Sequence, residues 1–316
     1  MLKFIVRRIF WTIPVLLVVI FMTFILMRQI PGNPFRQTER AVPAAVQQNL
    51  ERKFNLDKPW YMQYLYYVKG VVTFDLGPSL VVRGRDVNDI VVTHFPKSIE
   101  LGVYAFLFAI IFGVPLGVIA ALRHNTAADY SAMIFSNIFH ALPSFLIATL
   151  LIYFVALKAG ALPTSGWGEP LWTDPSDWRY KILPTIALGF YPMAIFARLV
   201  RGTMLETLQQ DYVRTARAKG LRYRRVVGLH VLRNSLIPVI TTAGPLLGFI
   251  ITGSFVIELI FNIPGIGRYY VTAVNARDFS VVMGLTVLLS VIIIIANLVV
   301  DILYGILDPR TRDARG

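Results

Sequence analysis

Cysteine is absent from this chain of 316 residues, which excludes disulfide bonds, thiolate metal sites and thiol nucleophiles. Any segment that meets an oxidising compartment must therefore keep its shape by packing alone. The sequence also has no Gly-Lys dipeptide, although a nucleotide-binding P-loop needs Gly-Lys followed by Ser or Thr to hold phosphates. We therefore expect this chain to bind no ATP and no cofactor of its own.

Histidine is scarce as well, with four residues that lie far apart in sequence: His94, His124, His140 and His230. A zinc protease motif on a helix needs two histidines four residues apart, so this spacing excludes it. No metal site is expected, and a membrane-embedded enzyme is a poor interpretation of the chain.

Charged residues make up only 16% of the chain, whereas 56% of the residues are hydrophobic and the mean hydropathy is +0.61. A soluble domain could not hide this much apolar surface, so the expected solvent is lipid. Charge-free runs near or above the length of a membrane-crossing helix cover residues 9–27, 101–122, 131–157, 234–257 and 279–300.

A sixth apolar run, residues 182–197, is shorter and contains Pro184, Gly189 and Pro192. It is either a kinked span that continues through Val200 or a re-entrant segment, and we treat it as a span. The predicted fold is an all-α membrane protein with a single domain, residues 1–316, and six transmembrane helices. Their approximate bounds are 9–30, 99–122, 131–157, 182–200, 234–258 and 279–305.

Lys and Arg residues predict the orientation, because short loops rich in these residues stay in the cytoplasm. Six spans put both termini on one side, and most of the Lys and Arg of the short loops fall on that side. We therefore expect cytoplasmic N and C termini, an extracytoplasmic segment at 31–97 and a cytoplasmic loop at 201–233. The formal net charge of +13 then reflects topology and anionic lipid rather than nucleic acid.

The segment 31–97 is the one part large enough to fold outside the membrane. Five aromatic residues crowd eight of its positions: Trp60, Tyr61, Tyr64, Tyr66 and Tyr67. They favour an amphipathic helix in the aromatic belt at the headgroup level, and are compatible with a docking surface or lid over a pathway.

The loop 201–233 carries the most specific local pattern. Thr203 and Glu206 fit a capping box, after which Leu205, Leu208, Tyr212 and Ala216 share one face of a helix. Gly220 is expected to end this helix in the left-handed conformation, with Lys219 near the negative end of the helix dipole. A second short helix is expected from Arg222 to Leu232.

Such a pair of helices can lie in the groove of a soluble partner, with apolar anchors buried and basic residues fixing the register. Arg222, Arg224 and Arg225 are equally explained by a loop that is basic because it is cytoplasmic. A cytoplasmic location does not explain the small residues Thr215, Ala216, Ala218 and Gly220, because retention in the cytoplasm does not require the backbone to approach a partner closely.

Two runs in the loop are specific: Thr215-Ala216-Arg217-Ala218-Lys219-Gly220-Leu221 and His230-Val231-Leu232-Arg233-Asn234-Ser235-Leu236-Ile237-Pro238. Further motifs are Leu2–Arg8, Leu56–Pro59 with Gln63-Tyr64, Asp75–Ser79, Pro264–Arg268, Arg277-Asp278 and Asp308–Arg310. In these residues the chain resembles ABC importer permeases of the peptide and nickel branch, and within it the first permease subunit of oligopeptide importers.

The chain departs from the wider permease pattern at two places. Arg214–Ala216 stands where the general loop has Glu-Ala-Ala, and His230–Arg233 stands where it has Ile-x-Leu-Pro. The docking role of the loop therefore carries over, but an ion pair made by the missing Glu does not.

The resemblance implies a second permease subunit, two ATPase subunits that carry ATP and Mg²⁺, an extracytoplasmic binding protein, and a multi-pass location in the bacterial inner membrane. The implied ATPase-coupling residues are Leu208, Asp211, Tyr212, Arg214, Thr215, Ala216, Arg217, Ala218, Lys219, Gly220 and Leu221. Pro264, Gly265, Gly267 and Arg268 would face the binding protein, or form only a tight, non-helical connection. The implied cargo is a di- or oligopeptide, with nickel complexes, glutathione and peptide antibiotics as alternatives within the branch.

The rival interpretation is a secondary transporter or channel, in which ionisable groups inside the bilayer couple transport to protons or ions. Glu100, Glu258 and Asp301 fall near predicted span ends, where water is close, while His140 lies deeper and is expected to make an interhelical hydrogen bond. The sequence has no clear inverted halves, which weakens this rival. The residues that line a substrate pathway cannot be assigned from the sequence.

Overall fold

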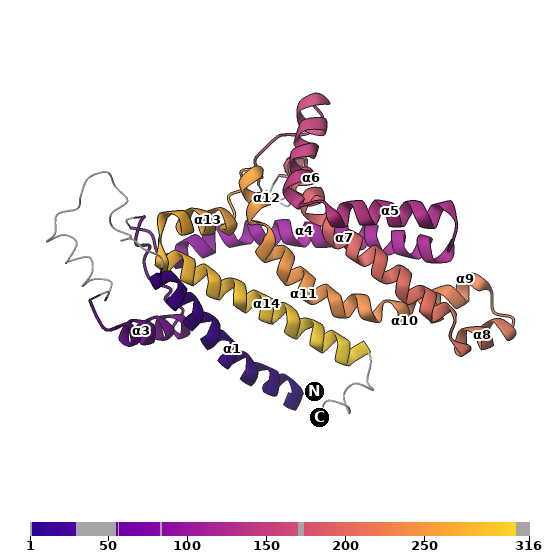
Figure 1. Cartoon of the computed structure of the whole chain (residues 1–316), viewed down its shortest axis with the longest axis horizontal. Coiled ribbons are helices and arrows are strands. Elements are labelled where there is room, and N and C mark those ends of the chain that lie inside the picture. The colour runs from indigo at the N-terminus through magenta and orange to yellow at the C-terminus, as the bar shows by residue number, and fades with distance from the viewer. Residues whose placement is uncertain (1, 30–54, 56, 83, 170–173, 308–316) are drawn as a thin grey trace. The chain divides into compact units, whose positions relative to one another are not determined.

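The computed structural model describes residues 2–29, 55, 57–82, 84–169 and 174–307 (Figure 1). The expectations for 31–54 and for the Asp308–Arg310 motif lie outside these residues. Within them the regular structure is helical, apart from an isolated bridge between Pro78 and Asp86. The chain forms two compact units, one from 99–263 with 295–316 and the other from 2–98 with 264–294.

Five helical stretches of the described chain are long and apolar enough to cross a membrane: Phe10–Gln29, Val87–Leu122, Trp178–Leu208, Ile237–Ile260 and Phe279–Val300. The first belongs to α1 (Leu2–Gln29), the second is α4 (Val87–Leu122), and the last belongs to α14 (Phe279–Leu307). The all-α architecture predicted from composition is confirmed for the described residues.

The predicted third span, 131–157, is not one straight helix. The helix α5 (Ala127–Ala141) and the stretch formed by α6 (Ser144–Leu151) and the π-helix η2 (Ile152–Lys158) differ in direction by 104°. Leu142, between them, is extended with ψ 128° because a residue that precedes proline, here Pro143, is disfavoured in the helical region. The bent pair adds a sixth span if it crosses as one broken segment.

The predicted fourth span is longer than expected, since α7 (Trp178–Leu208) continues as a helix through both Pro184 and Pro192. It is the centre of the first unit, with α5, α6 and α11 (Ile237–Gly253) packed against it. The buried side of α7 includes Leu183, Ala187, Phe196, Val200 and Met204.

Small residues bring α4 close to α7. Gly113 and Gly117 lie one turn apart on α4, and both face the backbone of α7 near Met193 and Ala197. A glycine at each position lets the two helices approach to backbone contact, as small residues spaced by four do in many membrane helix pairs.

The second unit contains α1, α3 (Trp60–Val72), the start of α4, α13 (Ile266–Ala276) and most of α14. The aromatic helix expected around Trp60 is α3. Its Tyr64 packs against Phe21 of α1 with ring centroids 5.5 Å apart and donates a hydrogen bond to the Leu17 carbonyl at 3.2 Å. Trp60, Tyr61 and Tyr66 are about half exposed.

Candidate functional site

The chain after α7 differs from the expected capping box. Thr203 and Glu206 lie inside α7, and the Thr203 hydroxyl donates to carbonyls of its own helix and to the Ser235 carbonyl at 2.9 Å. Thr203 therefore caps no helix, and the prediction of a helix start there was wrong. The break comes later, at Gln209 and Gln210, after which α8 (Asp211–Ala218) begins.

The apolar face of the loop helix also differs from the prediction. Val213 and Ala216 of α8 are buried against the chain itself, whereas Tyr212, expected on the apolar face, is 42% exposed. Because helix α7 ends at Leu208 and α8 begins at Asp211, the helical periodicity counted from Leu205 does not continue into α8. The side of α8 that remains open is polar, with exposed Asp211, Arg214, Thr215, Arg217 and Lys219.

The end of α8 agrees with the sequence prediction. Gly220 has φ +76°, its N–H donates to the Arg217 carbonyl at 2.9 Å, and Leu221 N–H donates to the Ala216 carbonyl at 3.4 Å. These bonds satisfy carbonyls that the last helical turn leaves unpaired, and the left-handed conformation that they need is natural to glycine.

The second short helix is present as α9 (Tyr223–Val226), the π-helix η4 (Val227–Leu232) and α10 (Arg233–Ser235). Val226, Val227 and Val231 are buried. The helix is held to α8 by two contacts: the Arg217 guanidinium lies 5.1 Å from the centroid of the Tyr223 ring, and the Asn234 amide donates to the Tyr212 hydroxyl at 2.8 Å.

The end of α7 that leads into α8 is bonded on two sides. Towards α5, the Arg201 guanidinium donates to both carboxylate oxygens of Asp129 at 2.6 and 2.8 Å. Towards α10, the Ser235 hydroxyl donates to the Thr207 hydroxyl at 3.1 Å. These bonds tie the end of α7 to both α5 and α10.

In the second unit, the Pro264–Arg268 motif is only partly a turn. Gly265 has φ −95° and ψ 179° and precedes α13, so Ile266, Gly267 and Arg268 are helical, which corrects the prediction of a turn through Gly267. The motif is anchored to the start of α4, because Ile266 N–H donates to the Ser98 hydroxyl at 2.9 Å and His94 Nδ1 lies 3.0 Å from the Pro264 carbonyl oxygen.

Two further motifs that are distant in sequence meet in this unit. The buried carboxylate of Asp278 accepts hydrogen bonds from the Ser79 hydroxyl, from Leu80 N–H at 3.1 Å and from Val81 N–H at 3.3 Å. It also accepts from Val281 N–H at 3.3 Å, in the first turn of α14. Asp278 thus fixes the 75–82 segment to the start of α14.

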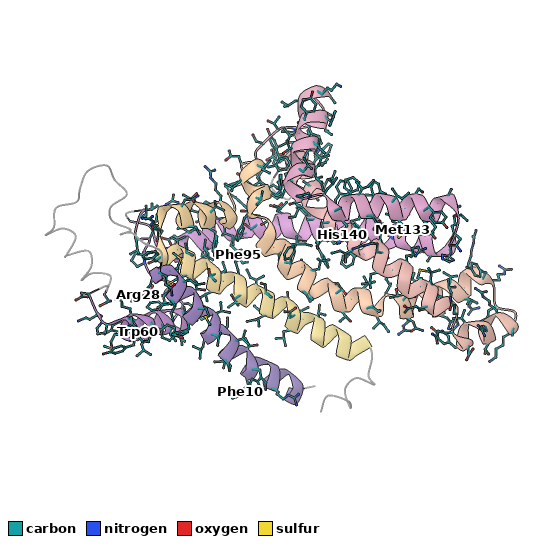
Figure 2. The ribbon with its side chains drawn as sticks, in the orientation of Figure 1. Phe10, Arg28, Trp60, Phe95, Met133 and His140 are labelled. Carbon is teal, nitrogen blue, oxygen red and sulfur yellow. The ribbon has the colours of Figure 1, made fainter. Side chains whose placement is uncertain are left out.

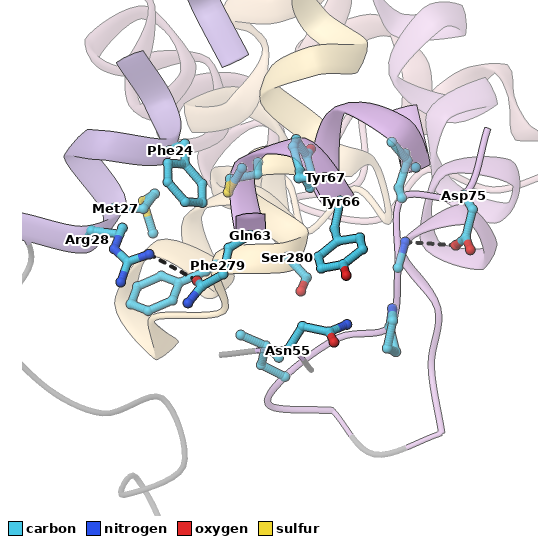
Figure 3. A pocket seen from close by; sticks show the side chains of 16 residues that line it. Phe24, Met27, Arg28, Asn55, Gln63, Tyr66, Tyr67, Asp75, Phe279 and Ser280 are labelled. Carbon is cyan, nitrogen blue, oxygen red and sulfur yellow. Dashed lines mark hydrogen bonds between the residues drawn. The ribbon is translucent and has the colours of Figure 1, made fainter. Parts of the chain in front are cut away.

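A half-open cavity of about 490 Å³ lies between α1, α3, the 75–80 segment and the start of α14 (Figure 3). The Arg28 guanidinium in its wall donates to the Gln63 side-chain oxygen at 3.0 Å. The buried Tyr67 hydroxyl has no hydrogen-bond partner among the described residues, and burial raises the pKa of this phenol above its ordinary value.

Sequence reasoning missed the polar network around Glu100. Its carboxylate accepts from Tyr104 Oη, Lys181 Nζ and Trp167 Nε1, each at 2.9 Å. The Lys181 ammonium also lies 4.4 Å from the centroid of the Trp167 ring. Glu100 had been expected near water, but it is nearly buried here, and Glu258 is fully buried with a hydrogen bond from Ser254 at 2.6 Å. The side chain of Asp301 lies outside the described residues.

The interhelical hydrogen bond predicted for His140 is not formed among the described residues. Its Nδ1 is buried and has no partner among the described residues, and the imidazole instead stacks on the Tyr191 ring with centroids 5.1 Å apart.

The comparison with solved structures identifies this arrangement of helices. The methionine ABC transporter MetNI in an inward-facing conformation has a chain that superimposes with a TM-score of 0.55, 16% identity, and coverage of 69% of this chain and 96% of that one. An amino acid ABC transporter crystallised with histidines gives a TM-score of 0.51, 13% identity, and coverage of 70% and 94%. The chain therefore shares its fold with chains of these two ABC transporters.

The sequence comparisons define the family within that class. Residues 113–313 match the binding-protein-dependent transport system inner membrane component, and residues 1–102 match its N-terminal counterpart, so the chain belongs to this family. The dipeptide transport system permease protein DppB of Bacillus subtilis is 47% identical over 99% of this chain and 98% of its own length. The oligopeptide transport system permease protein OppB of Haemophilus influenzae is 43% identical over 99% and 100%. The resemblance drawn from the motifs is thus confirmed.

Proposed function

We propose that this chain is the transmembrane permease subunit of an ATP-driven, binding-protein-dependent importer of di- and oligopeptides. The observation that carries the proposal is the full-length relation to permease proteins of dipeptide and oligopeptide transport systems, at 47% and 43% identity. The helical fold with five or six candidate spans supports it.

The chain would sit in the bacterial inner membrane with both termini in the cytoplasm, because the Lys and Arg of the short loops favour that side. It would form the translocation pathway with a second permease subunit. Two ATPase subunits would hold ATP and Mg²⁺, and this chain would contribute no phosphate-binding loop, in keeping with the absence of Gly-Lys from its sequence.

The polar side of α8 would dock on the ATPase subunit. Val213 and Ala216 anchor α8 to its own chain, so the groups left for a partner are charged ones such as Arg214, Arg217 and Lys219. ATP-driven closure would push α8, and the two residues between α8 and α7 leave little slack to absorb that push. The swing of α7 would then interconvert inward-open and outward-open states.

The extracytoplasmic binding protein would contact the second unit near Pro264, Gly265, Gly267 and Arg268. Hydrogen bonds to Ser98 and His94 hold this motif in a fixed position, as a docking surface requires. Arg268 is exposed and Arg277 is partly exposed, so the surface is basic, which favours an acidic patch on the partner.

The test is purification of the tagged chain from its own membranes in mild detergent, followed by mass spectrometry of the proteins that accompany it. We expect a second permease, two P-loop ATPases and, on a co-purifying binding protein, bound peptides. A tagged variant that lacks residues 211–219 is the matched control, and it should lose the ATPases while keeping the second permease. Recovery of the chain alone, with transport in liposomes that needs no ATP, would replace the proposal with a secondary transporter.

A further inference from the structure

Buried polar atoms without hydrogen-bond partners gather on one helix pair. Among the described residues such atoms are Ser136 Oγ and His140 Nδ1 on α5, Arg198 Nε on α7, and Tyr67 Oη elsewhere. Buried polar atoms in folded proteins almost always have a partner, so three on one pair of helices need an explanation. In a membrane protein, such groups commonly mark the path of a polar cargo.

Two contacts show that these three atoms share one seam between α5 and α7. The ion pair Asp129–Arg201 joins the helices at one end, and the stack of His140 on Tyr191, with 12° between the ring planes, joins them at the other. Ser136 lies one helical turn before His140, and Arg198 lies one turn before Arg201. Figure 2 shows His140 near the end of α5 that meets the bend to α6.

The seam has an uncompensated positive charge. Arg201 is neutralised by the carboxylate of Asp129, but within the described chain Arg198 forms no ion pair with an acidic side chain. Its guanidinium is within electrostatic reach of His140, which adds no negative charge. Burial of an unpaired guanidinium in an apolar span costs free energy. Its planar N–H donors can form two parallel hydrogen bonds to a carboxylate.

The seam also has an aromatic wall and remains accessible. The ring of Tyr191 faces that of Phe249 on α11 at 6.4 Å between centroids, and Phe249 is 59% exposed. Arg198, His140 and Tyr191 are each partly exposed, whereas Ser136 is fully buried. A small molecule that carries one carboxylate and an apolar body could therefore reach the charged group and lie against the rings.

We propose that the α5–α7 seam is a binding station for the terminal carboxylate of a peptide in transit, with Arg198 as its main ligand and His140 and Tyr191 as its wall. This inference rests on the proposed function and assigns part of the substrate pathway to residues of this chain. The carboxylate is the favoured group because the seam offers hydrogen-bond donors and a positive charge, on Arg198, that no acidic side chain of the described residues pairs; the acid of the seam, Asp129, is already paired with Arg201.

The complete complex in proteoliposomes, with its own binding protein, tests the inference. Uptake of trialanine and of its C-terminal amide is measured for the wild type, Arg198→Gln, Arg198→Lys and the matched control Arg179→Gln, which removes a charge from the exposed first turn of the same helix. We expect Arg198→Gln to slow trialanine uptake about ten-fold and amide uptake less than about two-fold, with Arg198→Lys intermediate for trialanine because lysine keeps the charge but loses the two-point contact. Arg179→Gln should change neither rate.

Equal loss for both peptides, or no loss for either, would overturn the inference. A second measurement tests the inference even if a variant fails to assemble or the complex does not transport the amide. Ala-Ala-(benzoylphenylalanine), with a free C-terminus, is photo-crosslinked to the wild-type complex, and adducts are expected between Ser136 and His140 or between Tyr191 and Arg201. Adducts elsewhere, with none in these ranges, would contradict the proposed binding station. Anionic lipid bound in the seam instead of the peptide would show that the seam binds a lipid headgroup. Absence of ATP-dependent uptake of either peptide by the wild type would instead reject the proposed function.

Discussion

The carboxylate of Asp129 and the guanidinium of Arg201 form a two-point ion pair at 2.6 and 2.8 Å, joining the first turn of α5 to the end of α7 that leads into α8. The Asp129 side chain is almost completely buried and also accepts the Asn125 N–H at 3.0 Å, while Arg201 keeps 26% exposure. This pair therefore links the broken span α5–α6 to the segment that we expect to receive the push from the ATPase.

Asp129→Asn should destabilise the protein, because it leaves the Arg201 guanidinium without its counter-charge in an apolar setting. Removal of one partner of a buried pair costs about 3 kcal/mol or more. Thermal unfolding of the purified complex should show a clear drop in Tm.

The control is Asp211→Asn, which breaks the pair between Asp211 and Arg214 on α8. Those atoms are 3.7 Å apart and both side chains are largely exposed, so the expected change in stability is close to zero. Equal Tm values for Asp129→Asn and the wild type would show that the buried pair contributes nothing to the α5–α7 contact.

Glu100→Gln should be more harmful than Tyr104→Phe, although both remove a contact in the same network. The first leaves the buried ammonium of Lys181 without its counter-charge, whereas the second removes one hydrogen bond to a carboxylate, worth about 2 kcal/mol. The double variant Glu100→Gln with Lys181→Met should recover most of the lost stability, because it removes both buried charges. A double variant no more stable than Glu100→Gln would argue against a charge effect.

Gly220→Val should leave insertion and assembly intact while lowering the amount of cargo imported per ATP hydrolysed. A Cβ at Gly220 would meet open space, so the effect comes from φ +76°, which a β-branched residue adopts only with strain of about 1–3 kcal/mol. Gly220→Asn is the matched variant, since asparagine tolerates the left-handed region and should stay near the wild type. Normal uptake per ATP in Gly220→Val would reject a conformational requirement at this position.

Sequence patterns correctly predicted the features that depend on composition and on local backbone preference. Charge-free runs indicated the apolar helices, and Gly220 was placed correctly in the left-handed conformation because that choice depends on a few neighbouring residues. The predicted start of the loop helix was wrong because the Thr203 hydroxyl donates to carbonyls of α7 and of Ser235 instead of capping a helix. No local sequence rule reveals a hydrogen-bond partner 32 residues away.

The charged contacts depended on tertiary structure in the same way. Ser79 and Asp278 both belong to motifs evident in the sequence, yet their contact joins residues 199 positions apart. Asp129 and Lys181 stand at the edges of apolar runs, where a lone charge usually meets water, so their burial could not be predicted from the runs themselves. The bend at Pro143 had a sequence signal in the proline, but its angle of 104° is set by packing.

Asp278→Ala should loosen the 75–86 segment and weaken the response to the binding protein. It removes the acceptor for Leu80 and Val81 N–H and for the Ser79 hydroxyl. Trypsin should then cleave faster after Arg85, which is exposed and lies within that segment, and stimulation of ATP hydrolysis by the binding protein should fall several-fold. Thr272→Ala is the control, since among the described residues its hydroxyl bonds the Arg268 carbonyl of its own helix and no other group. Unchanged cleavage and stimulation in Asp278→Ala would separate this carboxylate from the docking surface.

Gly117→Ala should destabilise the α4–α7 contact more than any exposed alanine substitution on the same helices. A Cβ at Gly117 would press on the Ala197 carbonyl oxygen and lie 2.8 Å from the Val200 Cβ, so the helices would have to move apart. Overpacking of this kind costs about 2 kcal/mol.

Gly202→Ala supplies the matched comparison, because a Cβ there meets no atom within 4 Å. Alanine favours a helix over glycine by about 1 kcal/mol, so this variant should be as stable as the wild type or slightly more stable. Thermal unfolding of both purified complexes measures the difference, and cargo uptake shows whether close contact of α4 with α7 is also needed for transport. If Gly117→Ala and Gly202→Ala unfold at the same temperature, α4 and α7 do not need the backbone contact that the two glycines of α4 allow.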